Sequence, residues 1–343
     1  MTSRERILAA IACGTTDRTP YDITDGRIWP ELHNFFYREY GLKEKDEIYN
    51  FLDTDLRWIE PSSFNPAPAF SAAVEINVPS EKTALVSAGL MAAVDSPEEV
   101  KKLYSPFDPG IFGEFDFVAF RKKWPDNAVA FIPYALPYFW NSCVWFGMDE
   151  VFIKIAENPD VYDALLEEMN QNSMAVLKHF LDKAAKYIDI IELWDDVGGQ
   201  SGMMVSPEWW RRTIKPYLKK EVDFVHSYGL KVFYHSCGAV RPIISDFIDL
   251  GIDVFMVFQT NAKNMEPKSI ADEFGGKICF YGGLEVQHLL SYGNTEEVEE
   301  QVKYNIDCFR DCGGYIAANC HSHISTIKGE NIVAMCKTAK CYK

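Results

Sequence analysis

The chain of 343 residues lacks any run of about 20 apolar residues, the length that a membrane-spanning helix needs. Basic residues are scarce: 34 Lys and Arg stand against 50 Asp and Glu, the formal net charge is −16, and no Lys/Arg run exceeds three residues. Such a surface repels phosphates and anionic lipids, so we expect neither a nucleic-acid partner nor membrane association. The first residues, Met1 to Ala12, resemble a charged amphipathic helix rather than a signal peptide, which predicts a cytoplasmic protein.

Paired Cys-x-x-Cys motifs are also missing, which argues against a structural zinc knuckle. The nine cysteines are odd in number and scattered along the chain, a pattern that favours reduced thiols and metal ligands over a disulfide framework. Neither GxGxxG nor GxxxxGK[ST] occurs, so no nucleotide-binding motif is visible.

The second half of the chain carries a repeated rhythm: a short apolar run, a polar or glycine-containing corner, then an amphipathic helix. This rhythm is typical of βα units and a parallel sheet. The predicted strands are Tyr187 to Leu193, Leu230 to Tyr234, Ile252 to Phe258, Lys277 to Tyr281 and Gly314 to Ala318. The predicted helices run from about Pro207 to Tyr228, up to Leu250, from Pro267 to Phe274, from Thr295 to about Cys312, and from about Glu330.

Five such units in succession predict an α/β fold, a (β/α)8 TIM barrel, with further strands from Thr19 to Ile23, Thr54 to Ile59 and Ala128 to Leu136. A doubly wound sheet is the alternative. We expect one domain over residues 1–343 with an N-terminal helical extension. Alternating residues in 74–78 and 83–86 predict an antiparallel β-hairpin within an insertion at about 61–93.

Polar and metal-binding residues gather directly after the predicted strands, where the active site of such a barrel forms. They are Asp195, Asp196, His235, Cys237, Gln259, Asn261, Glu285, Cys320, His321 and His323. We expect these side chains to converge on one cavity. The alternative for individual residues is structural, with Asp195 and Asp196 capping the next helix and Cys237 acting as a small buried hydrophobe.

A catalytic zinc ion is the metal that this set favours. Zinc binds Cys sulfur, His nitrogen and carboxylate oxygen tetrahedrally, and catalytic sites keep one position open for substrate. His235 and Cys237, two residues apart at a strand end, can both reach the barrel axis. Cys320 or His321 would complete a three-ligand site, with Glu285 as a fourth ligand.

The chain carries several specific motifs: SRERILAA with DRTP near the N-terminus, DDVGGQSGMMVSPEWWRRTIKPYLKK, HSCGAVRPII, FGGKICFYGGLEVQ, GNTEEVEEQV, GGYIAANCH and ENIVAM. Together these motifs resemble the uroporphyrinogen decarboxylase superfamily. The resemblance is strongest from Tyr187 to Met335 and weak between Trp29 and Asn127. It implies a (β/α)8 barrel, in agreement with the strand and helix pattern.

This superfamily holds decarboxylases and zinc-dependent methyltransferases that work with corrinoid proteins. The decarboxylases carry an arginine-rich N-terminal segment that holds porphyrinogen carboxylates, whereas TPYDITDGRIWPEL offers only Arg27 and two aspartates. Unpaired substrate carboxylates would cost several kcal/mol per buried ion. A metal-free decarboxylase is therefore the less favoured alternative.

Two ligand patterns of the methyltransferase branch are present. His235-x-Cys237 followed by Cys320 resembles the zinc site of methylcobalamin:coenzyme M methyltransferases. Glu285, Glu300 and His321 resemble the E…E…H zinc motif of bacterial O-demethylase methyltransferases, although Glu300 falls inside a predicted helix. The two patterns compete for the metal, and the sequence leaves the choice open.

The resemblance implies a zinc-dependent methyltransferase that moves a methyl group between a small donor and the cobalt of a corrinoid. The favoured donor is a methoxylated aromatic; a thiol methyltransferase and a non-catalytic binding protein are alternatives. No D-x-H-x-x-G cobalamin signature occurs, so we expect the corrinoid to come from a separate partner protein. Asp195, Asp196, Gln259 or Asn261 would orient the substrate or supply a proton.

Overall fold

Seven parallel strands form one sheet in which the order in space is the order along the chain. The computed structural model describes residues 1–24, 28–65, 89–133, 137–321 and 325–342. The strands are β1 (Leu56–Ile59), β2 (Ala128–Phe131), β3 (Ile190–Trp194), β6 (Lys231–His235), β7 (Val254–Phe258), β8 (Cys279–Leu284) and β9 (Tyr315–Asn319). Because the strand order never reverses, a doubly wound sheet is excluded and the predicted barrel-type α/β fold is confirmed.

The segment around Tyr21 closes the sheet between β9 and β1. Tyr21 forms a parallel bridge with Ala317 of β9, whose N–H donates to the Pro20 carbonyl at 2.9 Å. On the other side, the Asp55 N–H donates to the Tyr21 carbonyl at 3.0 Å. The predicted strand from Thr19 to Ile23 is thus present as this short bridging segment.

The carboxylate of Asp55 fastens this closure from a fully buried position. It accepts hydrogen bonds from the Tyr21 N–H at 3.0 Å, from Arg6 at 2.6 Å, and from Arg18 at 2.7 and 2.9 Å. Two guanidinium groups and a backbone donor compensate the charge, which is the condition under which a buried carboxylate is tolerated.

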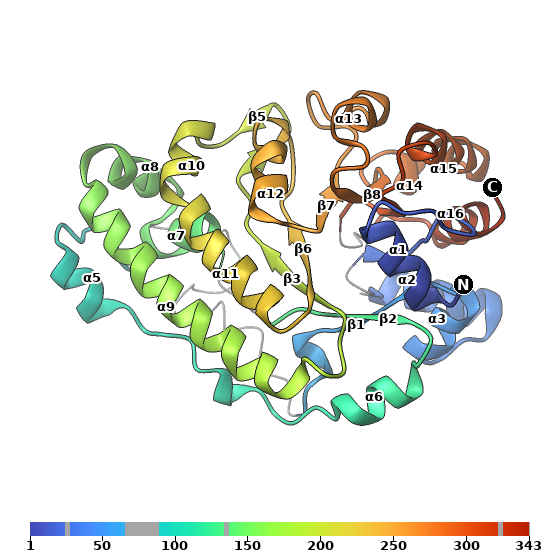
Figure 1. The fold of residues 1–343 in the computed structure, drawn as a ribbon, viewed down its shortest axis with the longest axis horizontal. Coiled ribbons are helices and arrows are strands. Elements are labelled where there is room, and N and C mark those ends of the chain that lie inside the picture. Colours follow the sequence, from blue (N-terminus) through green and yellow to red (C-terminus); the bar gives the residue numbers. More distant parts are fainter. Residues whose placement is uncertain (25–27, 66–88, 134–136, 322–324, 343) are drawn as a thin grey trace.

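Helices cover the outside of the sheet: Figure 1 shows α11 beside β3 and β6, α9 beside α11, and the two chain termini on the same side of the molecule. The helices are α1 (Ser3–Ile11), α2 (Pro30–Tyr40), α3 (Lys45–Leu52), α5 (Pro97–Leu103), α6 (Phe117–Lys123), α7 (Tyr138–Phe146), α8 (Met148–Glu157), α9 (Pro159–Ala184), α10 (Pro207–Thr213), α11 (Lys215–Ser227), α12 (Ile244–Leu250), α13 (Pro267–Phe274), α14 (Leu289–Tyr292), α15 (Thr295–Phe309) and α16 (Gly329–Cys341). Short 3-10 turns are η2 (Pro61–Ser63), η3 (Pro109–Ile111) and η4 (Arg241–Ile243), and β4 (Gly198–Gly199) pairs with β5 (Gly202–Met203) in a small antiparallel ribbon. Among the described helices, none combines the length and apolar composition that crossing a bilayer requires.

The apolar core has an inner and an outer layer because side chains alternate along each strand. Trp58, Phe233 and Tyr281 point into the barrel and contact one another edge to face or tilted. Ile7 and Ile11 of α1 join this inner cluster, and α1 contacts β1, β2 and β9. The predicted N-terminal extension is therefore a helix that closes the amino-terminal end of the barrel.

Some predicted boundaries are wrong. The single helix expected from Pro207 to Tyr228 is interrupted at Ile214 and continues as α11, because Pro216 lacks the N–H that an uninterrupted helix would need there. The helix expected to end at Leu250 begins with η4 and continues as α12. Gly198 and Gly199, which the sequence places in the polar corner after the strand, form β4 and pair with β5.

Other predictions fall outside the described residues. The hairpin proposed within the insertion at 61–93 lies in residues 66–88, and Arg27 and His323 also belong to the undescribed segments. These predictions stay untested by the structure.

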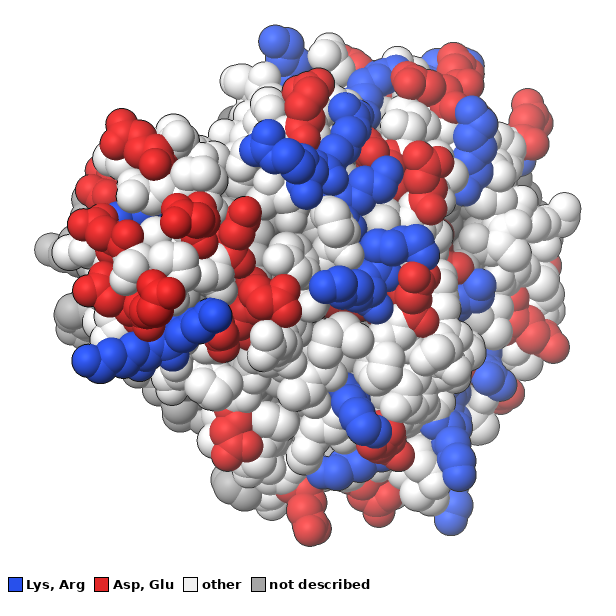
Figure 2. Space-filling view, turned by 60° about the vertical axis from the view of Figure 1, so that its left-hand side comes forward, with Lys and Arg blue, Asp and Glu red and all other residues white. Residues whose placement is uncertain are grey.

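The charges are unevenly spread over the face drawn in Figure 2. Acidic side chains crowd one lobe at the left, and across the rest of this face Lys and Arg side chains lie among acidic ones.

Candidate metal centre

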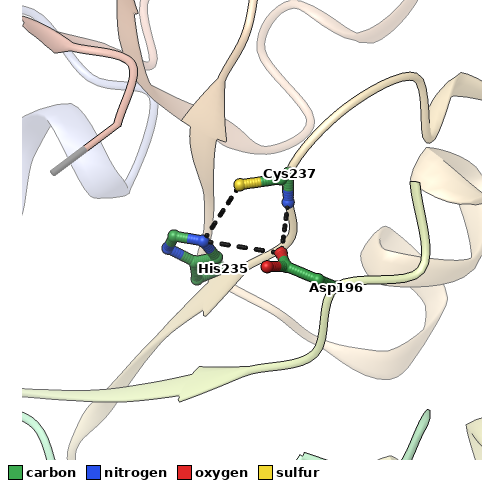
Figure 3. Close-up of side chains that lie close together, drawn as sticks. All are labelled: Asp196, His235 and Cys237. Carbon is green, nitrogen blue, oxygen red and sulfur yellow. Dashed lines mark hydrogen bonds and ion pairs between the residues drawn. The ribbon is translucent and has the colours of Figure 1, made fainter. Parts of the chain in front are cut away.

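Asp196, His235 and Cys237 converge at the carboxyl ends of β3 and β6 (Figure 3). His235 Nε2 lies 3.5 Å from Cys237 Sγ and 3.6 Å from Asp196 Oδ1, and the three ligand atoms lie within 4.8 Å of one another. Bond lengths of about 2.0–2.3 Å in a tetrahedral zinc site place ligand atoms roughly 3.3–3.8 Å apart. The two distances from His235 Nε2 therefore suit a metal ion that His235 shares with Cys237 and Asp196.

The strand register explains this convergence. His235 is the last residue of β6 and pairs with Trp194, the last residue of β3. Asp196 and Cys237 each follow by two residues, so both leave their strands at the same height. The Cys237 N–H donates to Asp196 Oδ1 at 2.8 Å and ties the two strand ends together.

Two glycines allow the β4–β5 ribbon to pack against the loop that carries Cys237. A Cβ on Gly198 would lie 2.4 Å from the Cys237 carbonyl oxygen. A Cβ on Gly238 would lie 2.6 Å from the Gly198 carbonyl, and Gly238 has a φ of +81°. The Ala239 N–H donates to the Gly199 carbonyl at 2.9 Å. The path of the Cys237 loop thus depends on backbone-to-backbone contact.

Gln259, directly after β7, links this loop to the end of β9. Its Oε1 accepts the Gly238 N–H at 2.8 Å, and its Nε2 donates to the Cys320 carbonyl at 3.5 Å. Cys320 is 1% exposed, and burial raises the pKa of its thiol to about 12. Its sulfur is not part of the cluster formed by Asp196, His235 and Cys237. Metal binding by Cys320 stays a prediction.

Asp195 faces a different neighbour from Asp196. Its carboxylate is buried and accepts the N–H groups of Phe139 at 2.8 Å and Trp140 at 2.9 Å, at the start of α7. A carboxylate is favoured at a helix N-terminus. Burial nevertheless raises the pKa of Asp195 to about 7. The structure thus gives Asp195 a capping contact, with α7 rather than with the following helix.

The raised pKa of Asp195 predicts a pH-dependent stability. In the unfolded chain this carboxyl ionises near pH 3.8, whereas in the folded protein it holds its proton until about pH 7. Between these values the folded state binds more protons, so the free energy of unfolding falls as pH rises, by about 1.4 kcal/mol per pH unit at most for this group. Urea denaturation at pH 5, 6 and 7 should show a weaker decline in Asp195→Asn than in wild type. Equal slopes would contradict this assignment.

The E…E…H residues do not share one position. Glu285 accepts backbone N–H groups of Gln287, His288 (2.8 Å) and Leu289 (2.9 Å), which caps the turn that leads into α14. Glu300 is exposed on α15.

Two further predicted site residues follow strand ends without joining the cluster. His321 comes two residues after β9, and its carbonyl accepts a hydrogen bond from Asn319. Asn261 is exposed beyond β7, and its side chain donates to Gln287 Oε1 at 3.1 Å. The structure therefore brings together the His-x-Cys pair but not the E…E…H set.

Sequence analysis did not identify one residue of the site. Glu192 of β3 is buried, and its Oε1 lies 3.8 Å from His235 Nδ1. A carboxylate within the otherwise apolar run IIELW was the signal that would have found it. Asp196 was predicted to act on substrate, and its position among possible metal ligands was also missed.

Comparisons with known proteins agree with this architecture. The family model described as "Uroporphyrinogen decarboxylase (URO-D)" matches residues 145–342. The methylcobamide:CoM methyltransferase MtbA of Methanosarcina acetivorans is 24% identical over 211 residues, which cover 62% of this chain and 56% of that protein. The chain thus spans little more than half the length of this relative. A solved methyltransferase from Methanosarcina mazei has the same fold, with a TM-score of 0.67 at 17% identity over 99% of this chain and 98% of that one.

Proposed function

The chain belongs to the uroporphyrinogen decarboxylase (URO-D) family, and from this membership and the geometry of the centre we propose that it is a zinc-dependent methyltransferase. It would exchange a methyl group between a small substrate and a corrinoid carried by a separate protein. The observation that carries the proposal is the convergence of His235 Nε2, Cys237 Sγ and Asp196 Oδ1 at the end of the barrel where active sites form. The relative MtbA, a methylcobamide:CoM methyltransferase by name, supports it.

The donor set fits a catalytic zinc ion. One nitrogen, one sulfur and one carboxylate oxygen are zinc ligands, and three protein ligands leave a fourth position open. The cluster in the structure makes Asp196 a candidate for the third zinc ligand, whereas the resemblance to the His-x-Cys…Cys pattern implies Cys320. Gln259 links the Cys320 carbonyl to the Gly238 N–H of the Cys237 loop, and this link supports Cys320 as a candidate ligand.

Zinc bound at this centre would supply a Lewis acid for the heteroatom that gives or receives the methyl group. The protein's own residues would hold the reactants. The Cys237 N–H keeps Asp196 directed toward the centre. The exposed amide of Asn261 would offer a hydrogen-bond donor at the rim of the barrel mouth.

We propose a small thiol, or its methyl thioether, as the substrate. The prediction of a methoxylated aromatic donor depended on Glu285, Glu300 and His321, and these residues do not converge. The His-x-Cys pair, which the resemblance associates with thiol methyltransferases, does converge.

A methoxylated aromatic is the second candidate because two tryptophans adjoin the tandem aspartates. Trp194 precedes Asp195 in the chain, and the backbone N–H of Trp140 donates to Asp195 Oδ1. Both tryptophans are partly exposed residues, and their indoles would offer aromatic surface to a substrate ring.

Metal analysis followed by a methyl-transfer assay tests the proposal. Untagged protein should contain about one zinc per chain, which a chelator wash removes. The zinc-loaded protein should then demethylate methylcobalamin in the presence of a small thiol, followed by the change in cobalt absorbance. Protein from zinc-replete medium that holds no metal would overturn the proposal and favour the metal-free decarboxylase or the binding protein.

A further inference from the structure

The imidazole of His235 lies between two carboxylates, one facing each ring nitrogen. Nε2 faces Asp196 Oδ1 and Cys237 Sγ at 3.6 and 3.5 Å, and Figure 3 shows this edge of the ring turned toward both side chains. Nδ1 faces Glu192 Oε1 at 3.8 Å. The ring is therefore oriented with Nε2 toward the candidate metal position and Nδ1 toward Glu192.

Glu192 occupies an unusual position for a charged residue. It lies in the middle of β3, pairs in register with Phe233 of β6, and is only 5% exposed. Burying a carboxylate costs free energy unless a partner compensates it. The contact with His235 provides a reason for an acidic side chain at this strand position.

We propose that Glu192 is a positioning residue that accepts the Nδ1–H of His235 and holds Nε2 ready for the metal. The inference rests on the proposed zinc function. A carboxylate behind a metal-binding histidine fixes both the tautomer and the orientation of the ring. Closing the present 3.8 Å to a hydrogen bond of about 2.9 Å needs a movement of less than about 1 Å.

Two variants of similar volume separate the hydrogen bond from packing. Glu192→Gln keeps an oxygen acceptor, whereas Glu192→Leu removes it. We expect zinc affinity, measured by competition with a chromophoric chelator, to fall roughly 10–100-fold in Glu192→Leu and only a few-fold in Glu192→Gln. The visible spectrum of the cobalt-substituted protein should change in Glu192→Leu, because the histidine ring is no longer held.

Glu221→Gln is the matched control, because Glu221 is another buried carboxyl that accepts the Tyr138 hydroxyl at 2.8 Å and does not belong to the cluster of Asp196, His235 and Cys237. It should leave zinc affinity unchanged. Wild-type affinity in Glu192→Leu would overturn this inference while leaving the proposed function standing. Wild-type protein without zinc affinity would overturn both.

Thermal unfolding of the metal-free variants shows whether Glu192→Leu folds. If Glu192→Leu does not fold, the contact is tested in zinc-loaded Glu192→Gln, by the NMR signal of the His235 Nδ1–H. A shift of that signal relative to wild type supports the contact, and an unchanged signal overturns it.

Discussion

The Cys237→Ala variant is expected to lose zinc affinity by at least about 100-fold, and methyl transfer with it. Removing Cys237 takes away the one sulfur of the cluster, and ligand loss should exceed the 10–100-fold effects that follow from changes behind a ligand. Elemental analysis and chelator competition measure the loss. The exposed cysteine gives a matched control: Cys341→Ala removes a thiol without touching the centre.

The same assay decides the third ligand. Asp196→Ala should release zinc if the observed cluster is the binding site, and Cys320→Ala should release it if the resemblance to the His-x-Cys…Cys pattern gives the ligand set. Unchanged zinc content in Cys237→Ala would contradict both arrangements, because both contain Cys237.

The Gly238→Ala variant is expected to lose about 4 kcal/mol of folding free energy together with most of its zinc affinity. An alanine Cβ would lie 2.6 Å from the carbonyl carbon and oxygen of Gly198, and the φ of +81° is strained for any residue with a side chain. Since the obstacle is backbone rather than a flexible side chain, the ribbon or the Cys237 loop must move. Urea denaturation measures the first effect and chelator competition the second.

Gly229→Ala separates the clash from the backbone strain. Gly229 has a similar φ of +77°, but no heavy atom lies within 4 Å of the position that its Cβ would take. We expect it to cost only about 1 kcal/mol and to leave zinc affinity intact. Equal losses in the two variants would show that the contact with Gly198 does not hold the loop in place.

The strands of the second half could be predicted because a parallel strand covered on both faces is a continuous apolar run followed by a helix. The run Ile252 to Phe258 became β7 with its end correct. The bounds of the strand predicted from Thr19 to Ile23 were less accurate. This segment is extended because it pairs with β9 and contacts the buried Asp55, and its own composition does not determine where the pairing ends.

The site was partly predictable for a related reason. The end of a strand fixes the backbone positions of the residues next to it, so the proximity of His235 and Cys237 could be predicted. The direction that a loop side chain takes depends on the nearest unpaired backbone donors. Asp195 and Glu285 turn toward helix starts, whereas Asp196 turns toward the centre, and no spacing in the sequence distinguishes them.

The closing bridge also governs the order of events during synthesis. Thr24, just beyond the bridging segment, donates its N–H to Asn319 Oδ1 across 295 residues of chain. A ribosome adds about 5–20 residues per second, so the earliest segment waits on the order of 15–60 s for the strand that completes its pairing. Throughout that interval the nascent sheet has an open edge at the Tyr21 segment, where β9 will pair. Chains that terminate before β9 would keep this open edge permanently. We expect such chains to aggregate or to bind chaperones, even though they contain most of the barrel.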